Sequence, residues 1–257
     1  MKIIIFKLKT VTHFITLSLI VLLLASFTLS INAETLYFGY SDRKVPIYSV
    51  DTGEEKKVAL TFDAAWGADK TSEIIKILKE NDVGGTFFLV GFWSEKYPDK
   101  IKEINDAGLD IGTHSNTHPK MSTLSESQII SELSISSKLI SDITGKPVRF
   151  FRPPFGDYNN LLISSADGLG LQTIQWSVDS LDWKGLSGQQ ILERVKQGAH
   201  NGAIVLFHNN ADHILEALPL VINFLKSQNY KMVKLSDLVL QSDYSVDNLG
   251  VQKRTSG

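Results

Sequence analysis

Six polar side chains that could transfer protons or bind a metal ion follow apolar, β-rich runs of the sequence. They are Asp63, His114, His118, Arg152, Asp182 and His208. Carboxylates and imidazoles can accept and return protons, and imidazoles also bind divalent metal ions. His114 and His118 are four residues apart, so a helical turn between them would aim both rings at one ion. Each residue alone has an ordinary structural explanation, such as a turn, a cap or an ion pair, but their shared position at strand ends indicates a site.

The elements that must position these side chains alternate between short β-rich runs and longer amphipathic runs. A long helix is expected to begin near Ser125, with Ser125 and Gln128 as a capping box, and to end at residues 144–145. The alternation predicts βαβ units and a parallel sheet. Because no Gly-rich dinucleotide motif follows the first strand, we expect an α/β fold of the distorted (β/α)7-type parallel barrel, with its chemistry at the carboxyl ends of the strands. Strands are predicted at residues 58–62, 86–90, 109–113, 148–151, 171–178, 203–207 and 231–235, and further helices at 74–81, 97–107 and 214–225.

Composition excludes several classes of protein. The chain has 257 residues and no Cys, which rules out disulfides, thiolate zinc sites and a cysteine nucleophile. The first 33 residues hold three Lys and no acidic residue, so the remainder carries 23 basic and 28 acidic residues, a net charge of −5. A mildly acidic body argues against nucleic acid as a partner.

The N-terminal segment has the pattern of a targeting sequence. Lys2, Lys7 and Lys9 precede an apolar run at residues 14–29, and Ala33 ends the segment. Residues 1–33 are therefore expected to be a signal peptide or an N-terminal membrane anchor. Either alternative exports the body, to be secreted or held at the outer face of the cytoplasmic membrane and the cell wall. We expect residues 34–56 to be a leader lying across the barrel, 57–240 to be the single catalytic domain, and 241–257 to be a flexible tail.

Five motifs, in order, resemble those of the polysaccharide deacetylases, which are carbohydrate esterase family four with a NodB-homology domain. The resemblance covers residues 57–240, and the Trp66-Gly67 context is most similar to the sporulation-associated PdaB-type branch. It implies a NodB-like domain that hydrolyses N-acetyl groups with the help of a divalent metal, usually zinc. The motifs are Thr61-Phe62-Asp63, His114-Ser115-Asn116-Thr117-His118, Arg152-Pro153-Pro154-Phe155-Gly156, Asp179-Ser180-Leu181-Asp182-Trp183 and Leu206-Phe207-His208.

The resemblance also implies a role for each matched residue. Asp63 matches the general base and His208 the general acid, while Arg152 matches the residue that holds the base and Asp182 the carboxylate that orients the acid. The metal ligands are matched by His114 and His118. The remaining positions form the pocket: the backbone N–H of Phe155 matches an oxyanion donor, and Trp183 and Leu206 match walls of the acetyl pocket. His200 and His213 lie outside the motifs, and we expect them to be structural.

One position departs from the family pattern. The first motif usually has two adjacent aspartates, the second of which is the third metal ligand, and here that position is Ala64. Three arrangements remain open: Asp63 itself binds the metal, Asp69 from the following loop does so, or the metal is weakly bound or absent. Of these, we favour a weakened metal site with Asp63 still essential; retention of the acid His208 and the base Asp63 argues against a non-catalytic protein.

These features predict an exported hydrolase that removes N-acetyl groups from a glycan, with peptidoglycan or a chitin-like oligosaccharide as substrate. The alternative is a low-activity or non-catalytic glycan-binding member of the same fold, in which the metal was lost with the second aspartate. A hydrolase of another class is disfavoured because the chain has no Gly-x-Ser-x-Gly, His-Glu-x-x-His or P-loop motif.

Overall fold

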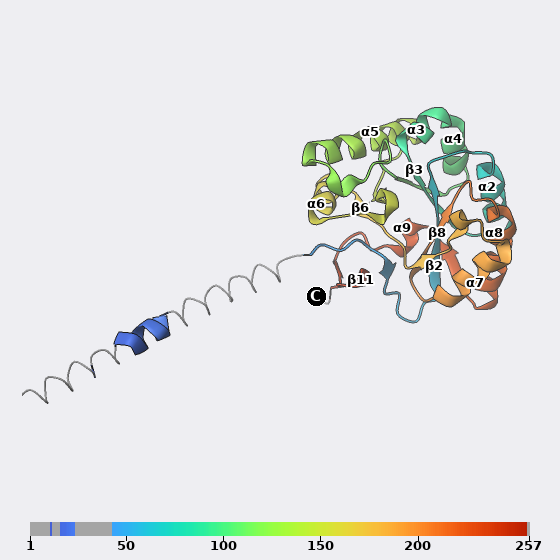
Figure 1. The fold of residues 1–257 in the computed structure, drawn as a ribbon. Coiled ribbons are helices and arrows are strands. Elements are labelled where there is room, and N and C mark those ends of the chain that lie inside the picture. The colour runs from blue at the N-terminus through green and yellow to red at the C-terminus, as the bar shows by residue number, and fades with distance from the viewer. Residues whose placement is uncertain (1–10, 12–15, 24–42, 256–257) are drawn as a thin grey trace, which may run out of the picture. The chain divides into compact units, whose positions relative to one another are not determined.

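The computed structural model describes residues 11, 16–23 and 43–255 (Figure 1). Residues 44–257 form one compact unit, to which the rest of this description applies. Most of the predicted targeting segment and the start of the predicted leader lie outside the described residues. In the described part of the chain, no helix has the length and apolar character needed to cross a bilayer.

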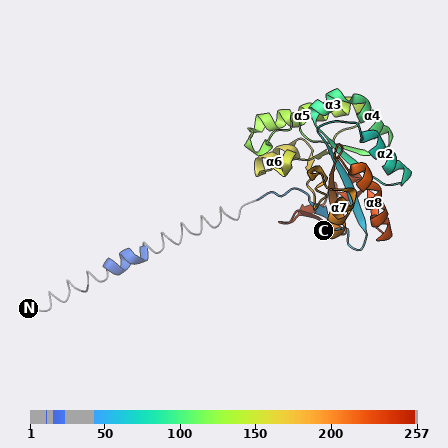
Figure 2. The same cartoon turned by 45° about the vertical axis from the view of Figure 1, so that its right-hand side comes forward.

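A curled sheet, mainly parallel, forms the centre of the compact unit and confirms the predicted α/β fold with a parallel barrel-like sheet. Helices surround it on the outside (Figures 1 and 2). The main path of strands runs β10-β11-β1-β8-β2-β3-β4-β5-β6, with β7 added to β8 and β9 to β2. The strands are β1 (Ser49–Val50), β2 (Lys57–Ala64), β3 (Thr86–Leu89), β4 (Asp110–Thr113), β5 (Phe150–Phe151), β6 (Gln172–Thr173), β7 (Val178–Asp179), β8 (Ala203–His208), β9 (Lys231–Val233), β10 (Tyr244–Val246) and β11 (Val251–Arg254).

The core is built on the alternating side chains of β2. Phe62 and Ala64 belong to the larger apolar cluster, whereas Ala59 belongs to a second cluster, because successive strand residues point to opposite faces. The ring of Phe62 stacks between Phe87 and Phe207 of the neighbouring strands, with centroids 4.9 and 5.7 Å away. This packing fixes β2 between β3 and β8, and β2 ends in Asp63 and Ala64.

Helix ends follow the local sequence signals. The predicted capping box is confirmed, since Ser125 and Gln128 satisfy each other's backbone N–H groups at the start of α5, and Gly145 ends that helix in the left-handed conformation with φ 69°. The helices are α2 (Thr71–Glu80), α3 (Gly91–Lys96), α4 (Pro98–Asp106), α5 (Glu126–Thr144), α6 (Asn160–Gly168), α7 (Gly188–Gly198), α8 (Ile214–Ser227) and α9 (Leu235–Leu238), with short 3-10 turns η1 (Met121–Thr123), η2 (Pro154–Gly156) and η3 (Asp182–Lys184).

The structure confirms the helix predicted at 97–107, which is α4 and begins at Pro98, whose fixed φ suits a first helical position. It adds α3, a short helix directly before α4 that the sequence did not predict. Two predictions are corrected. The single strand predicted at 171–178 is two short strands, β6 and β7. The prediction of a flexible tail from residue 241 is wrong, because β10 and β11 form an antiparallel pair in this segment. β11 also pairs in parallel with β1 and so adds to the edge of the sheet. Hydrogen bonding to an available sheet edge, rather than an apolar pattern, orders that polar segment.

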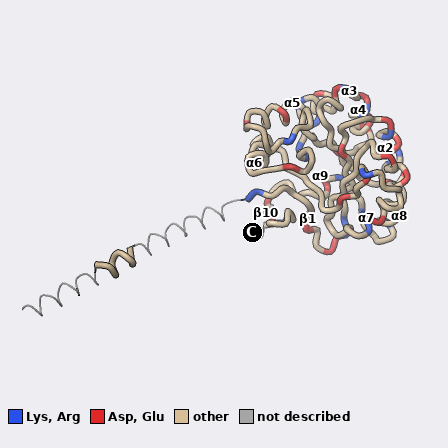
Figure 3. Tube along the Cα trace, in the orientation of Figure 1, with Lys and Arg blue, Asp and Glu red and all other residues tan. Residues whose placement is uncertain are grey.

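Charged residues of both signs are interspersed over the helices (Figure 3). This mixed distribution agrees with the small net charge of −2 for the whole chain.

Candidate active site

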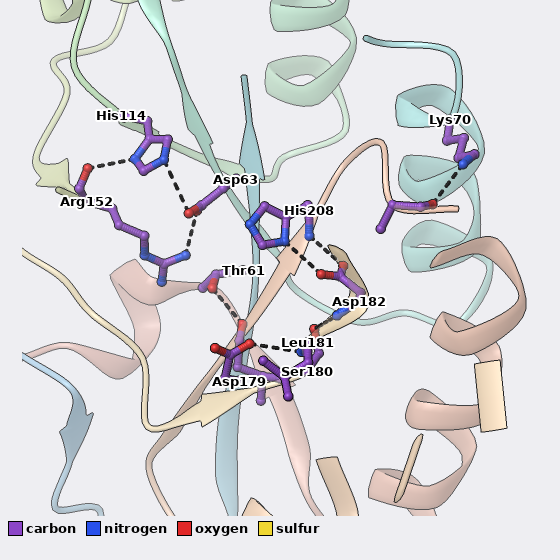
Figure 4. A network of polar contacts seen from close by, with 12 residues as sticks. Thr61, Asp63, Lys70, His114, Arg152, Asp179, Ser180, Leu181, Asp182 and His208 are labelled. Carbon is purple, nitrogen blue, oxygen red and sulfur yellow. Dashed lines mark hydrogen bonds and ion pairs between the residues drawn. The ribbon is translucent and has the colours of Figure 1, made fainter. Parts of the chain in front are cut away.

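Asp63 is buried at the carboxyl end of β2 and is held by Arg152 (Figure 4). The guanidinium Nη1 donates to Asp63 Oδ1 at 2.7 Å, and Nη2 donates to the carbonyl of Gln175 at 3.1 Å. The same guanidinium stacks on the ring of Phe88, 4.2 Å from its centroid. Burial is the largest single influence and acts to raise the pKa of Asp63, but the charge and hydrogen bond of Arg152 and the nearby His114 and His208 together outweigh it and lower that pKa. Asp63 is therefore an ionised, fixed proton acceptor at neutral pH.

His208 ends β8, the strand next to β2, and its register partner is Asp63. Adjacent strands are about 4.8 Å apart, so the two side chains leave the sheet side by side (Figure 4). Asp182 is buried behind the imidazole and accepts from Nδ1 and from the backbone N–H of His208, both at 2.7 Å. Burial lowers the pKa of His208, but the hydrogen bond and charge of Asp182 exceed that effect and raise it. The imidazole is accordingly tuned to carry a proton.

The loop that follows β4 presents His114 and His118 to the same edge of the sheet. His114 Nδ1 lies 2.8 Å from the carbonyl oxygen of Arg152, and in the neutral ring this nitrogen donates to it. Burial lowers the pKa of both imidazoles, that of His118 to about 4, so both are uncharged at neutral pH. Glu132 of α5 fixes the loop by accepting from the backbone N–H groups of Asn116 and Thr117, each at 2.8 Å.

Strained backbone is concentrated in the loops around this edge. Four non-glycine residues there have positive φ: Ser115 (68°), His118 (57°), Phe155 (61°) and Leu181 (54°). Such conformations cost on the order of 1–3 kcal/mol each and persist only where the surroundings enforce them. The site is thus preorganised by its packing.

The donors present fit a divalent metal only in part. His114 Nε2 faces Asp63 Oδ2 at 3.5 Å, close to the ~3.3 Å between two ligands of a tetrahedral zinc with bonds of about 2.0 Å. However, no group of three metal-ligating side chains occurs among the described residues. Ala64 is fully buried in the apolar cluster, and Asp69 is exposed and completes no such group. A site with three protein ligands is therefore not assembled, and we assign no chemical step to a metal.

The predicted pocket residues surround the same edge but differ in exposure. Leu206 is buried in β8, next to Asp179 of β7. Phe155 and Trp183 are largely exposed, with relative accessibilities of 69% and 59%. Trp183 lies in η3 next to Asp182, and the ring of Phe155 meets the edge of His118 with centroids 4.6 Å apart. The predicted residues of β2 and β8, of the loop after β4, and of η2 and η3 therefore lie at this edge of the sheet.

Some site residues carry no sequence signal. Gln175 holds both Arg152, through its carbonyl, and Gly156, to whose carbonyl its Nε2 donates at 3.0 Å. Glu132 lies on a helix 14 residues beyond His118, and nothing in the sequence distinguishes it from the other polar residues of that helix. Trp66 could have been suspected as a large apolar residue directly after a catalytic strand, and it lies 5.1 Å from His118 between ring centroids.

The comparisons with known proteins agree with this geometry. A family model described as polysaccharide deacetylase matches residues 50–174. The chain is 33% identical over 211 residues to the peptidoglycan-N-acetylmuramic acid deacetylase PdaA of Bacillus subtilis, covering 80% of each chain. It is 31% identical to a peptidoglycan-N-acetylglucosamine deacetylase of Bacillus cereus, covering 71% of this chain and 68% of that one.

Among solved structures, the chain is similar to BA3943 of Bacillus anthracis, described as a pseudoenzyme of carbohydrate esterase family 4. The identity is 37%, the TM-score is 0.74, and the match covers 82% of this chain and 70% of that one. A mutant of BA3943 is described as having restored enzymatic activity. The likeness therefore extends both to named deacetylases and to a named pseudoenzyme.

Proposed function

Because the chain belongs to the polysaccharide deacetylase family, we propose that it removes N-acetyl groups from a cell-wall glycan, with peptidoglycan as the polymer. The observation that carries this proposal is the pairing of Asp63 and His208 on neighbouring strands. One is tuned to be ionised and the other to be protonated. Relatives named as peptidoglycan deacetylases support the choice of polymer.

The proposed reaction is acid–base hydrolysis of the acetamide. Asp63 accepts a proton from a water molecule whose oxygen attacks the carbonyl carbon, and the backbone N–H of Phe155 stabilises the resulting oxyanion. His208 then donates its Nε2 proton to the amide nitrogen, because Asp182 occupies Nδ1. The C–N bond breaks and releases acetate and the free amine of the sugar. Arg152 keeps the carboxylate of Asp63 oriented throughout.

Metal use and location are further parts of this proposal. We propose a weakened metal site, in which His114 and His118 remain but the donor at position 64 is missing. We also propose that the chain acts outside the cytoplasmic membrane. Lys2, Lys7 and Lys9, followed by the apolar run at residues 14–29, support export as a cleaved or a membrane-anchored form.

A second function is supported by a specific observation. Ala64 removes a ligand, and a solved structure 37% identical to this chain is described as a pseudoenzyme. The alternative is a glycan-binding protein with little or no turnover. Both proposals expect the protein to bind glycan, but only the first expects it to release acetate.

Acetate release from peptidoglycan and from N-acetylglucosamine oligomers tests both proposals. The first expects release by the unmodified chain and none by Asp63→Asn, because asparagine cannot accept the proton. Asp99→Asn is the matched control, since that carboxylate lies on α4 with its side chain 93% exposed. Glycan binding without acetate would support the second proposal. Equal turnover by Asp63→Asn and the unmodified chain would refute the base assignment.

A further inference from the structure

Aromatic side chains form a continuous surface beside the candidate active site. The surface consists of Phe92, Trp66, His118 and Phe155, and we call it the aromatic ridge. Successive ring centroids are 6.4, 5.1 and 4.6 Å apart. Trp66 is 58% exposed and Phe155 69% exposed. Large rings that remain in water contribute little to folding, and a contiguous exposed patch of them marks an interaction site.

The backbone beneath the aromatic ridge is fixed although the rings are exposed. The carbonyl of Gly67, the residue after Trp66, accepts from the indole Nε1 of Trp93 at 2.6 Å and from Asn209 Nδ2 at 2.9 Å. Trp93 and Asn209 are buried, so these bonds attach the Trp66 loop to α3 and to the residue after His208. A fixed backbone lowers the entropy lost when a ligand is bound.

The start of α3 is fixed in the same way against the histidine loop. Gly91 and Phe92 donate their backbone N–H groups to the carbonyls of Ser115 and Asn116 at 3.0 and 3.2 Å. A Cβ at position 91 would lie 2.0 Å from Asn116 Oδ1, so only glycine allows this approach. Phe92 is thereby held beside the loop that ends in His118.

We propose that the aromatic ridge is a sugar-stacking subsite, which binds the N-acetylhexosamine unit next to the one that is hydrolysed. A pyranose ring has an apolar face of C–H groups and a polar rim of hydroxyls, which matches exposed aromatic faces beside polar backbone. The position supports this occupant, because His118 contacts His114, whose Nε2 faces Asp63. This inference rests on the proposed glycan substrate, and assigns to Trp66 and Phe92 a part in binding it.

Binding of chitotetraose to the full-length protein tests the aromatic ridge separately from catalysis. Isothermal titration calorimetry gives the dissociation constant, and fluorescence follows Trp66 among the four Trp of the chain. We expect about tenfold weaker binding for Trp66→Ala and a smaller loss for Phe92→Ala, because stacked aromatic contacts have modest individual energies. Trp66→Phe keeps a stacking face and should retain most of the affinity. Leu249→Ala, at an 81% exposed apolar residue in the turn between β10 and β11, is the control and should bind as the unmodified chain does.

The outcomes separate this inference from the proposed hydrolysis. Loss of binding in Trp66→Ala supports the aromatic ridge even if no variant releases acetate. The inference is overturned if the unmodified chain does not bind chitotetraose, or if Trp66→Ala and Phe92→Ala bind it with unchanged affinity. It is also overturned if a sugar-free stem peptide binds with the same sensitivity to Trp66→Ala. Acetate release in the absence of such sensitivity would leave the hydrolase proposal standing and refute only the subsite.

Discussion

Replacing Asp182 by asparagine should shift the pH dependence of turnover. Asp182 is 1% exposed and accepts two hydrogen bonds from His208, one from Nδ1 and one from the backbone N–H, both at 2.7 Å. Asparagine retains the shape but removes the negative charge that stabilises the imidazolium. Since His208 must be protonated to act as the acid, its pKa sets the alkaline limit of activity.

The expected size of the shift follows from the lost charge-assisted bond. A hydrogen bond to a charged group contributes about 1.5–3 kcal/mol, and one pKa unit corresponds to about 1.4 kcal/mol. Loss of the charge of Asp182, which raises the pKa of His208 against the effect of burial, should therefore destabilise the imidazolium by about 1.5–3 kcal/mol and lower that pKa. The alkaline limb of kcat/KM moves to lower pH with it. The stability that the pair contributes is present below the ordinary histidine pKa and is lost as pH rises through the folded-state pKa, so the variant loses stability mainly in acid.

Two measurements check this prediction. Acetate release across pH 5–9 gives the limb, and NMR titration of the His208 ring gives its pKa even at low turnover. Asp179→Asn is the matched control. Asp179 lies at the end of β7 and accepts from the backbone N–H of Leu181 at 2.9 Å rather than from His208, so its removal should shift the limb by much less. An unchanged pKa in Asp182→Asn, or equal shifts in both variants, would refute this account of the acid.

Two further substitutions test the buried ion pair and the metal site. Arg152→Met should lower the free energy of unfolding, measured by urea denaturation, by about 3–5 kcal/mol, because it leaves Asp63 buried without its cation. Lys138→Ala removes one partner of an exposed ion pair and is the control, which should lower it by less than about 1 kcal/mol. If the double variant Asp63→Asn/Arg152→Met were no more stable than Arg152→Met, unpaired charge would not be the cause. Ala64→Asp should increase the zinc bound per chain in equilibrium dialysis and make Tm rise with added zinc, and Ala64→Asn should not, because an amide is a poor ligand. Equal zinc binding in these two variants would contradict the role of position 64.

The sequence predicted the positions of site residues best where a single motif directly follows a predicted strand. Asp63, His114 and His208 each follow an apolar run, and parallel strands bring their carboxyl ends to one edge, so the sequence alone could predict that these three residues lie close together. The capping box at Ser125 was equally readable because a cap depends only on residues three apart. These signals depend on residues that are close in the sequence, and the fold then brings the strand-end residues together in space.

Other features depend on contacts between distant residues and therefore had no local signal. Glu132 holds the histidine loop from α5, and Gln175 supports Arg152 through its backbone carbonyl, which any residue type could provide. The tail predicted as flexible contains β11, whose partner β1 lies about 200 residues earlier in the chain. The aromatic ridge combines residues from two loops, from α3 and from η2, and its exposure is a property of the folded surface.

The departure at Ala64 can coexist with an intact acid–base pair because the contacts that hold the pair do not depend on the side chain at position 64. Ala64 is buried in the apolar cluster, whereas Asp63 is held by Arg152. Arg152 holds Asp63 and Asp182 holds His208 through side-chain hydrogen bonds in which Ala64 takes no part. A metal-binding side chain could therefore be missing at this position without displacing the proposed base or the proposed acid.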